Sequence, residues 1–584
     1  MKKHFCERTR IIHWTYNLQN NIYNVLEKIQ DWRPTINADG NKITLPEGID
    51  SSRIEIHADY EQIIDSKGNV FKPLTSKTVE LLVIYTDKKG KKHKVKPASN
   101  LEVTGKFVQQ ENKNPKPKVA VEIAEWYSNS NENLKLNKDF KIFVKGKLDE
   151  KLNKMFNELK LDFKDIFNKE IEIKSFVDSD TTNGNIVFDL TENKIPGYDE
   201  ETYEMIIDND VTIKAANRIG AFWSTRTLLQ MLKSSENFEL PKGQMKDYPK
   251  FKKRGLSFDV GRKAVSMDIL KAIVKEMSRY KMNELQVHLS DNLIFLEDYV
   301  SDKKEDKDIE RSFDAYSLIW RLESSKYKEV DGKKVYLHNE DYHYTIDEFK
   351  KFMNDSNDLS VNIVPELDFP ATLYQLQKFE KNLQLKNLVQ MLMVKEHWLI
   401  ILISQILKFV KLIKEILDDY TNEGKIFDKN SRTTVHIGCD EFFDNPDAYY
   451  DFANEMFKYF IDKGIQVRLW GSFTHIRSAS KHIKEEYKDK VEMNIWSLGW
   501  ADPSAMYDEA YKLINTLDSP TYMVPNGTGS RGAYRDFLNN KHIYNHYEAN
   551  IMGNSNIPSG APQMLGGMYA IWGDSLLDVR VYWC

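Results

Sequence analysis

The sequence predicts an α/β protein whose largest part is a (β/α)₈ TIM barrel, preceded by an α+β domain and a small β-rich N-terminal domain. Three observations predict this architecture. Between residues 248 and 584, eight strand-like runs alternate with helical stretches, which is typical of a barrel. Between residues 119 and 245, strands and helices mix without that rhythm. Residues 1–112 contain short alternating runs separated by turns that carry Lys and Gly.

The bulk composition excludes several classes of partner. The chain has 584 residues, enough for two or three domains, and its 83 Lys and Arg residues nearly balance 88 Asp and Glu residues. This balance argues against nucleic acid as a partner. No apolar run is long enough for a membrane span. The three cysteines, Cys6, Cys439 and Cys584, lie too far apart for a metal pattern or a disulfide framework.

The N-terminal region is predicted to be β-rich because residues 53–57 and 79–85 alternate apolar and polar side chains. Its first eight residues are basic, but no apolar stretch follows them, so we identify no export signal. The basic segment 113–118 contains two prolines and is the expected linker to the next domain.

The α+β domain is predicted over residues 119–245. Its clearest helix runs from 218 to 232, and its predicted strands are 140–144, 185–188, 203–207 and 211–215.

The barrel region supplies polar or aromatic residues after each of its predicted strands. These strands are 256–259, 284–289, 361–367, 434–437, 467–470, 492–495, 522–524 and 567–571. The residues that follow them, in chain order, are Arg262, Asp291, Asp368, Asp440 with Glu441, Trp470, Trp496, Tyr534 with Asp536, and Trp572 with Asp574. Each alone is more often a packing residue, a cap or a salt bridge. Together they indicate one site, because catalytic groups of such barrels lie where the strands end.

The pair Asp440-Glu441 is the centre of this candidate site. Adjacent acids ordinarily face solvent or begin a helix. Here an apolar, β-branched run precedes them and Phe442 and Phe443 follow, so we expect at least one acid to be buried. A buried carboxylic acid has a raised pKa, which suits proton donation.

These residues resemble glycoside hydrolase family 20, the β-N-acetylhexosaminidases and lacto-N-biosidases. The resemblance covers about residues 115–584, and residues 119–245 are similar to the small domain that precedes the barrel in this family. The matching segments are 254–262, 280–291, 364–368, 436–441, Trp470, Trp496, 533–536 and 566–572.

The resemblance implies an exo-acting retaining glycoside hydrolase that releases terminal β-linked N-acetylhexosamine from a glycan, without a metal or organic cofactor. The nucleophile is the substrate's own 2-acetamido oxygen, which gives an oxazolinium intermediate. Two alternatives stay open: a lacto-N-biosidase that releases a disaccharide, and an inactive, damaged homologue that only binds glycans or serves at a surface. The resemblance also implies secretion or a cell-surface location.

The resemblance implies a role for each candidate residue. Glu441 is the general acid and base, and Asp440 orients the acetamido group. The implied substrate-binding residues are Arg262 and Asp574 at the sugar hydroxyls, Trp470, Trp496 and Trp572 as walls, Tyr534 at the acetamido oxygen, and Asp536. The implied supporting residues are Asp291, Asp368 and His436. Many relatives carry Glu where this chain has Asp574, which leaves the preference at the 4-hydroxyl open.

Two segments depart from the family pattern. After Asp368 the family has Asp-x-Pro-Gly-His, whereas this chain has Ala371 and Thr372, and the later residues 397–407 form an apolar run in place of a polar one. Reading the third base of each codon with the first two bases of the next can restore both motifs. We therefore hypothesise that residues 369–408 are frame-shifted, and we expect misfolding or weak activity from the chain as written. The chain also stops just past the eighth strand, so we expect the last barrel helix to be truncated.

Overall fold

The computed structural model describes residues 22–177, 183–292, 318–369, 410–422, 424–428, 433–440, 446–475, 479–525 and 534–573. The chain divides into two compact units. One contains residues 1–250 with 558–562, and the other contains residues 251–557 with 563–584.

The N-terminal part of the first unit is β-rich, as predicted. A three-stranded antiparallel sheet contains β3 (Ile54–Ala58), β5 (Leu81–Thr86) and β6 (Lys92–Val95), while β4 (Lys77–Val79) pairs with β7 (Leu101–Val103). The predicted single run 79–85 is therefore two strands. The break falls at Glu80, whose backbone N–H donates to the Asp59 side chain at 3.1 Å, and the chain changes sheet there.

The rest of the first unit is an α+β layer built on a seven-stranded mixed sheet. The strands are, in spatial order, β11 (Ile173–Ser175), β10 (Ile142–Lys145), β12 (Ile186–Asp189), β14 (Val211–Ala215), β13 (Tyr203–Ile207), β16 (Gly243–Asp247) and β8 (Glu125–Tyr127). Helices α2 (Glu150–Phe167) and α3 (Arg218–Ser234) contact each other through a buried ion pair of 2.7 Å between Arg226 and Asp162. Helix α3 begins after Asn217, whose side chain accepts from the first backbone N–H groups.

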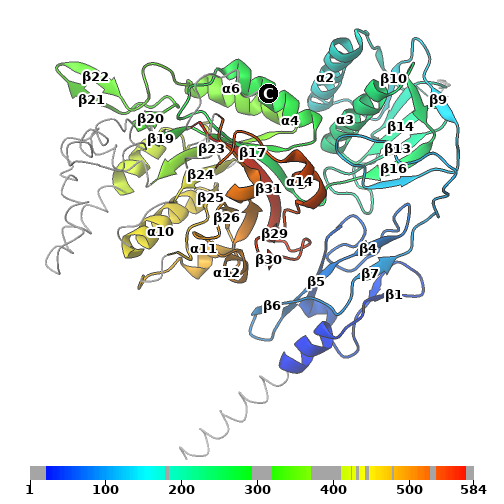
Figure 1. Ribbon diagram of the computed structural model, residues 1–584, viewed down its shortest axis with the longest axis horizontal. Helices are drawn as coiled ribbons and strands as arrows, with labels where there is room; N and C mark the ends of the chain where they lie inside the picture. The colour runs from blue at the N-terminus through cyan, green and yellow to red at the C-terminus, as the bar shows by residue number, and fades with distance from the viewer. Residues whose placement is uncertain are drawn as a thin grey trace, which may run out of the picture. The chain divides into compact units, whose positions relative to one another are not determined.

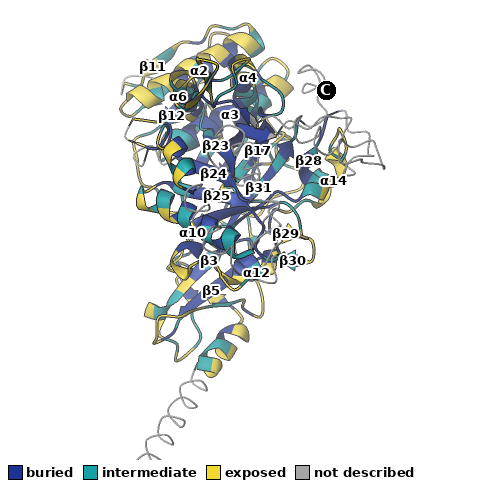
Figure 2. Ribbon diagram, turned by 90° about the vertical axis from the view of Figure 1, so that its left-hand side faces the viewer, coloured by how far each residue is buried: buried dark blue, intermediate teal, exposed yellow. Residues whose placement is uncertain are grey.

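The second unit is a closed parallel barrel, which confirms the predicted fold class (Figure 1). Strand β17 pairs with β18 on one side and with β31 on the other, so the sheet closes on itself. The eight strands are, in order, β17 (Lys253–Asp259), β18 (Glu284–His288), β23 (Asn362–Phe369), β24 (Thr434–Gly438), β25 (Gln466–Trp470), β26 (Val491–Ile495), β27 (Lys512–Asn515) and β31 (Met564–Ile571). Most of their residues are buried, and the barrel strands labelled in Figure 2 are largely dark blue.

The seventh strand position is divided between two pieces. Strand β27 pairs with the first half of β31, and β28 (Tyr522–Met523) pairs with its end, with the short helix α13 (Asp518–Thr521) between them. The predicted strand 522–524 identified only the second piece. The first piece was missed because only two apolar residues, Leu513 and Ile514, lie between its polar ends.

Helices between the strands include α4 (Met267–Arg279), α6 (Ile346–Asp358), α10 (Pro446–Asp462), α11 (Glu485–Lys488), α12 (Pro503–Asp508) and α14 (Asn540–His546). Two hairpins are inserted between β18 and α6. They are β19 (Ser290–Asn292) with β20 (Leu318–Trp320), and β21 (Tyr327–Val330) with β22 (Lys333–Tyr336). No helix within the described ranges combines the length and the apolar character needed to cross a bilayer.

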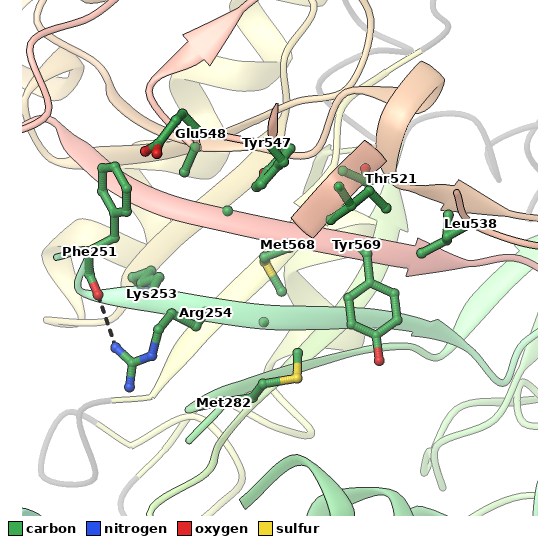
Figure 3. Close-up of a pocket in the computed structure, with 14 residues that line it drawn as sticks. Phe251, Lys253, Arg254, Met282, Thr521, Leu538, Tyr547, Glu548, Met568 and Tyr569 are labelled. Atoms are coloured by element: carbon green, nitrogen blue, oxygen red, sulfur yellow. Dashed lines mark hydrogen bonds between the residues drawn. The ribbon is translucent and has the colours of Figure 1, made fainter. Parts of the chain in front are cut away.

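A groove of about 310 Å³ is lined by residues of β17 and β31, together with residues of α13, α14 and the segment that follows α14. Figure 3 shows the two strands side by side, with Tyr547 and Thr521 on one side of them and Met282 on the other. None of the predicted site residues lines this groove. The predicted site residues instead follow the carboxyl ends of the strands.

Candidate active site

The carboxyl ends of the barrel strands bring most of the described candidate residues into one connected network. Its members by direct contact or electrostatic interaction are Arg262, Asp291, Asp368, His436, Asp440, Trp470 and Trp572, together with His288 and Glu366.

The end of β24 is shaped by two successive residues in the left-handed region. Gly438 has φ 70° and Cys439 has φ 68°. A Cβ atom at Gly438 would lie 1.6 Å from Oδ1 of Asp368, so only glycine allows that carboxyl group to approach the strand. The Cys439 carbonyl accepts from the Tyr449 hydroxyl at 2.5 Å, which fixes the turn. This turn delivers Asp440, which is half-buried.

Asp368 is a buried acid beside Asp440. Its backbone N–H donates to Ser290 Oγ at 2.8 Å. Burial, together with the negative charges of Asp440 and Asp291, raises the pKa of Asp368 well above its ordinary value. Asp368 therefore favours its neutral form, in which a carboxylic acid can donate a hydrogen bond.

The guanidinium of Arg262 is held by two carboxylates. Its Nη1 lies 3.0 Å from Asp259 Oδ2, and its Nη2 lies 2.6 Å from Asp291 Oδ2. The guanidinium carbon is 5.5 Å from the centre of the Trp572 ring. This arrangement fixes one cation beside the Trp572 ring.

Glu366 is the fully buried carboxylate at the centre of the network. Its Oε1 accepts from Trp470 Nε1 at 2.6 Å, and its Oε2 accepts from Gln286 Nε2 at 2.8 Å. Burial alone would raise the pKa of Glu366, but His436 and His288 outweigh burial and lower this pKa to about 2. Glu366 is therefore ionised at neutral pH.

His436 supports the aromatic wall. Its Nδ1 accepts from the Gly438 backbone N–H at 3.1 Å, and its ring packs edge-on against Trp470 with centroids 4.9 Å apart. Burial lowers the pKa of His436 to about 3, so the ring is neutral at neutral pH.

Aromatic rings line the mouth of the site. Trp572 packs against Trp470 and Tyr522, with ring centroids 5.6 Å apart in both pairs. The indole nitrogens of Trp496 and Trp572 are buried, and neither has a hydrogen-bond partner within the described ranges. Buried donors without a partner are costly, so a ligand that accepts from them gains affinity.

Two predicted residues lie differently from expectation. The Tyr534 hydroxyl donates to Asp518 Oδ2 at 2.9 Å, and its ring packs on Tyr522 at 5.5 Å. Asp536 is exposed, and no contact joins it to the network in the part of the chain that the structure describes. In the proposed role Tyr534 would exchange its present partner for an acetamido group, and the roles of both residues stay predictions.

Several predictions fall on residues that the structure does not describe. Glu441 and Asp574 lie outside the described ranges, as do Ala371, Thr372 and all of the suspected frame-shifted segment 369–408 except Phe369. Their roles stay predictions.

His288 and Glu366 belong to this network, although the sequence did not single them out. Both lie inside segments that carry the family resemblance, 280–291 and 364–368, but neither follows a predicted strand. The available signal was a charged or titratable residue inside a run that reads as fully buried, where such a group needs a specific partner.

Family models match both parts of the chain that carry this fold. The model described as "Glycosyl hydrolase family 20, domain 2" matches residues 121–248, and "Glycosyl hydrolase family 20, catalytic domain" matches residues 251–299 and 314–582.

Two curated relatives are similar to the chain over different lengths. The N,N'-diacetylchitobiase of Vibrio harveyi is 38% identical over 91 residues, which cover 15% of this chain and 10% of the relative. The lacto-N-biosidase of Bifidobacterium bifidum is 22% identical over 449 residues, which cover 70% of this chain and 33% of the relative. The chain thus spans a third or less of these relatives.

A solved structure supports the fold. The β-N-acetylhexosaminidase from Bacteroides fragilis superposes with a TM-score of 0.53 at 16% identity, over 80% of this chain and 88% of that one. At this identity the similarity concerns the fold alone.

Proposed function

This chain belongs to glycoside hydrolase family 20, and from that premise we propose that it is an exo-acting retaining hydrolase of terminal β-linked N-acetylhexosamine. The observation that carries the proposal is the position of Asp440. A left-handed turn delivers this acid beside the buried Asp368, at the carboxyl end of a barrel strand.

Asp440 and its neighbour Glu441 have different tasks in this proposal. The substrate's 2-acetamido oxygen attacks the anomeric carbon and forms an oxazolinium ion, while Glu441 protonates the departing glycosidic oxygen. Asp440 accepts a hydrogen bond from the acetamido N–H and stabilises the positive charge that develops on the oxazolinium ring. Glu441 then takes a proton from the water that opens this ring, and the anomeric configuration is retained.

The walls of the site hold the sugar in this proposal. Arg262, fixed by its two carboxylate partners, binds the 3- and 4-hydroxyls, and Asp574 binds the 4- and 6-hydroxyls. Trp470 and Trp572 pack on the acetamido methyl and the sugar ring. The indole N–H of Trp496 is available to a sugar oxygen.

A second candidate is release of a disaccharide. The relative that covers 70% of this chain is a lacto-N-biosidase, which favours testing this reaction. The discriminating comparison is release of lacto-N-biose against release of N-acetylglucosamine from aryl glycosides. A preference for the disaccharide would replace the first candidate.

The experiment pairs the chain as written with a frame-restored version in which residues 369–408 are read in the shifted frame. We expect the restored version to hydrolyse an aryl N-acetyl-β-glucosaminide, and Glu441→Gln to lower its turnover by about 10²–10⁴-fold. Near-parental rates for Glu441→Gln would contradict the role of Glu441. Sugar binding without turnover by the restored chain would favour the non-catalytic, glycan-binding alternative.

A further inference from the structure

His288 lies at the end of β18 with both ring nitrogens against carboxylate oxygens. Its Nε2 is 2.6 Å from Asp291 Oδ2, and its Nδ1 is 3.0 Å from Glu366 Oε1. The residue is 2% exposed. Each ring nitrogen therefore faces a carboxylate oxygen. A neutral imidazole carries one N–H and would turn the lone pair of its other nitrogen toward one of these oxygens, so the geometry favours the charged ring.

The groups around His288 favour that charge. Asp291 on β19 and Glu366 on β23 contact the ring directly, and Asp368 also interacts with it electrostatically. The cation of Arg262 is compensated by Asp259 as well as by Asp291, and the Trp572 ring packs edge-on at 5.2 Å. Burial alone would lower the pKa of His288, but Glu366 and Asp291 outweigh it and raise this pKa well above its ordinary value.

Each acid partner of His288 also holds a wall of the site through the same oxygen atom. Asp291 Oδ2 contacts Arg262 Nη2 at 2.6 Å, and Glu366 Oε1 accepts from Trp470 Nε1 at 2.6 Å. One chain of contacts therefore runs across the mouth of the barrel. Its members, in order, are Arg262, Asp291, His288, Glu366 and Trp470.

We propose that His288 is a positioning residue that fixes the hydroxyl-binding Arg262 and the acetamido-side Trp470 at one separation. The inference rests on the proposed function and names a specificity device for it. A sugar gains full affinity only when it presents its hydroxyls and its 2-acetamido group at that separation. Without the bridging cation, the Asp291 and Glu366 carboxylates repel each other and the two walls are no longer coupled.

The first test is a double-mutant cycle in the frame-restored enzyme, with kcat/KM on an aryl N-acetyl-β-glucosaminide as the readout. In the parent, the effect of the double variant Arg262→Lys with Trp470→Phe on kcat/KM should differ from the product of the two single effects by about five-fold or more. In the His288→Gln background the two effects should multiply to within about two-fold. We also expect His288→Gln alone to lower kcat/KM by about 10–100-fold. Coupling that persists in His288→Gln would overturn the proposal, whereas a merely structural role would lower stability without abolishing the coupling.

His436→Gln is the matched control. His436 is an equally buried histidine near the same Glu366 oxygen, at 3.3 Å, but its ring is neutral. It is expected to change activity while leaving the coupling between Arg262 and Trp470 in place. If His288→Gln fails to fold, Asp291→Asn breaks the same chain one contact away and should abolish the coupling in the same manner.

The second test does not need turnover. In protein labelled with ¹⁵N at the imidazole nitrogens, the His288 signals, assigned by their loss in His288→Gln, should remain those of a doubly protonated ring at about pH 8. A neutral ring at that pH would overturn the inference. A charged ring in a restored protein that hydrolyses no N-acetylhexosaminide would refute the proposed function and leave the bridging geometry supported.

Discussion

Buried charges occupy both ends of the barrel interior, and the two groups differ in how completely they are paired. Near the amino ends of the strands, Arg468 contacts Glu284 at 2.7 Å and Glu492 at 2.6 Å, and Lys253 contacts the same two acids at 2.8 and 3.0 Å. Two cations thus meet two anions. We call these four residues the lower quartet.

The group at the carboxyl ends is not closed in this way. Asp368 is kept near neutrality by burial beside Asp440, and the indole nitrogens of Trp496 and Trp572 have no partner among the described residues. Removing one member of a charge-balanced buried group leaves an uncompensated charge and destabilises the fold, whereas buried donors without a partner retain the capacity to bind a polar ligand. The carboxyl end is therefore where function is expected, and the lower quartet is where stability is expected.

The largest expected effect is on stability, at the lower quartet. Arg468→Met leaves Glu284 and Glu492 buried with Lys253 as their one remaining cation in the quartet, and should lower the free energy of unfolding by about 3–5 kcal/mol. Urea unfolding measures this loss. The triple variant Arg468→Met with Glu284→Gln and Glu492→Gln should recover part of it, and an unchanged midpoint for Arg468→Met would remove the distinction between the two ends.

The next effect is on catalysis, at the carboxyl end. Asp440→Asn should lower kcat of the frame-restored enzyme by about 10²–10³-fold, because the amide cannot stabilise the developing positive charge. Its free energy of unfolding should change by less than about 1 kcal/mol, because Asp440 is half-buried. A large loss of stability with kcat retained would place Asp440 with the structural charges instead.

Glu284→Gln and Asp368→Asn each replace a carboxyl group by an amide of similar shape. At neutral pH they should change the free energy of unfolding in opposite directions, by about 1–3 kcal/mol. Burial alone would raise the pKa of Glu284, but Arg468 and Lys253 lower this pKa to about 2. The ionised Glu284 carboxylate therefore stabilises the folded state at any pH above its ordinary pKa of 4.5. Glu284→Gln should therefore destabilise. The pKa of Asp368 is raised above its ordinary value of 3.8, so its ionised form costs stability, and Asp368→Asn should stabilise.

The pH dependence of this pair supplies the control. The loss in Glu284→Gln should disappear as pH falls from 4.5 through about 2, since the native carboxylate is then protonated. The gain in Asp368→Asn should shrink as pH falls toward 3.8, where both states bind the proton. Thermal melts across this range measure both trends, and shifts of the same sign would contradict the assignment of charge states.

The smallest expected effect is at Trp496. Trp496→Phe removes an indole N–H that has no partner in the described ranges, so its stability should stay within about 0.5 kcal/mol of the parent. Loss of one hydrogen bond to the sugar should raise KM about five-fold, or about 1 kcal/mol. Steady-state kinetics measure the change in KM, and a thermal melt measures the change in stability. An unchanged KM would mean that this donor does not meet the substrate.

The limits of helices and strands were predictable where a single hydrophobic period ran through the whole element. Strands β13 and β14 have the predicted limits, and α3 extends the predicted helix by two residues, from 232 to 234. Strand β27 was missed because its apolar core is only two residues long, and the break at Glu80 depends on a tertiary hydrogen bond. Local patterns carry no information about such contacts.

The strand-end pattern predicted that Arg262, Asp440 and Trp572 lie together, and the structure joins them in one network. His288 and Glu366 were not predicted, because their importance comes from contacts between β18, β19 and β23 that the sequence does not place together. Asp536 also follows a predicted strand, but its side chain is exposed and its role stays a prediction.

The most direct measurement is the dependence of kcat on the basicity of the substrate's acetamido oxygen, in the frame-restored enzyme. Aryl glycosides with N-acetyl, N-fluoroacetyl and N-trifluoroacetyl groups differ chiefly in that basicity. If this oxygen is the nucleophile that Asp440 orients, kcat falls steeply with each added fluorine. A kcat that is independent of fluorination would contradict substrate-assisted catalysis and point to a nucleophile supplied by the protein.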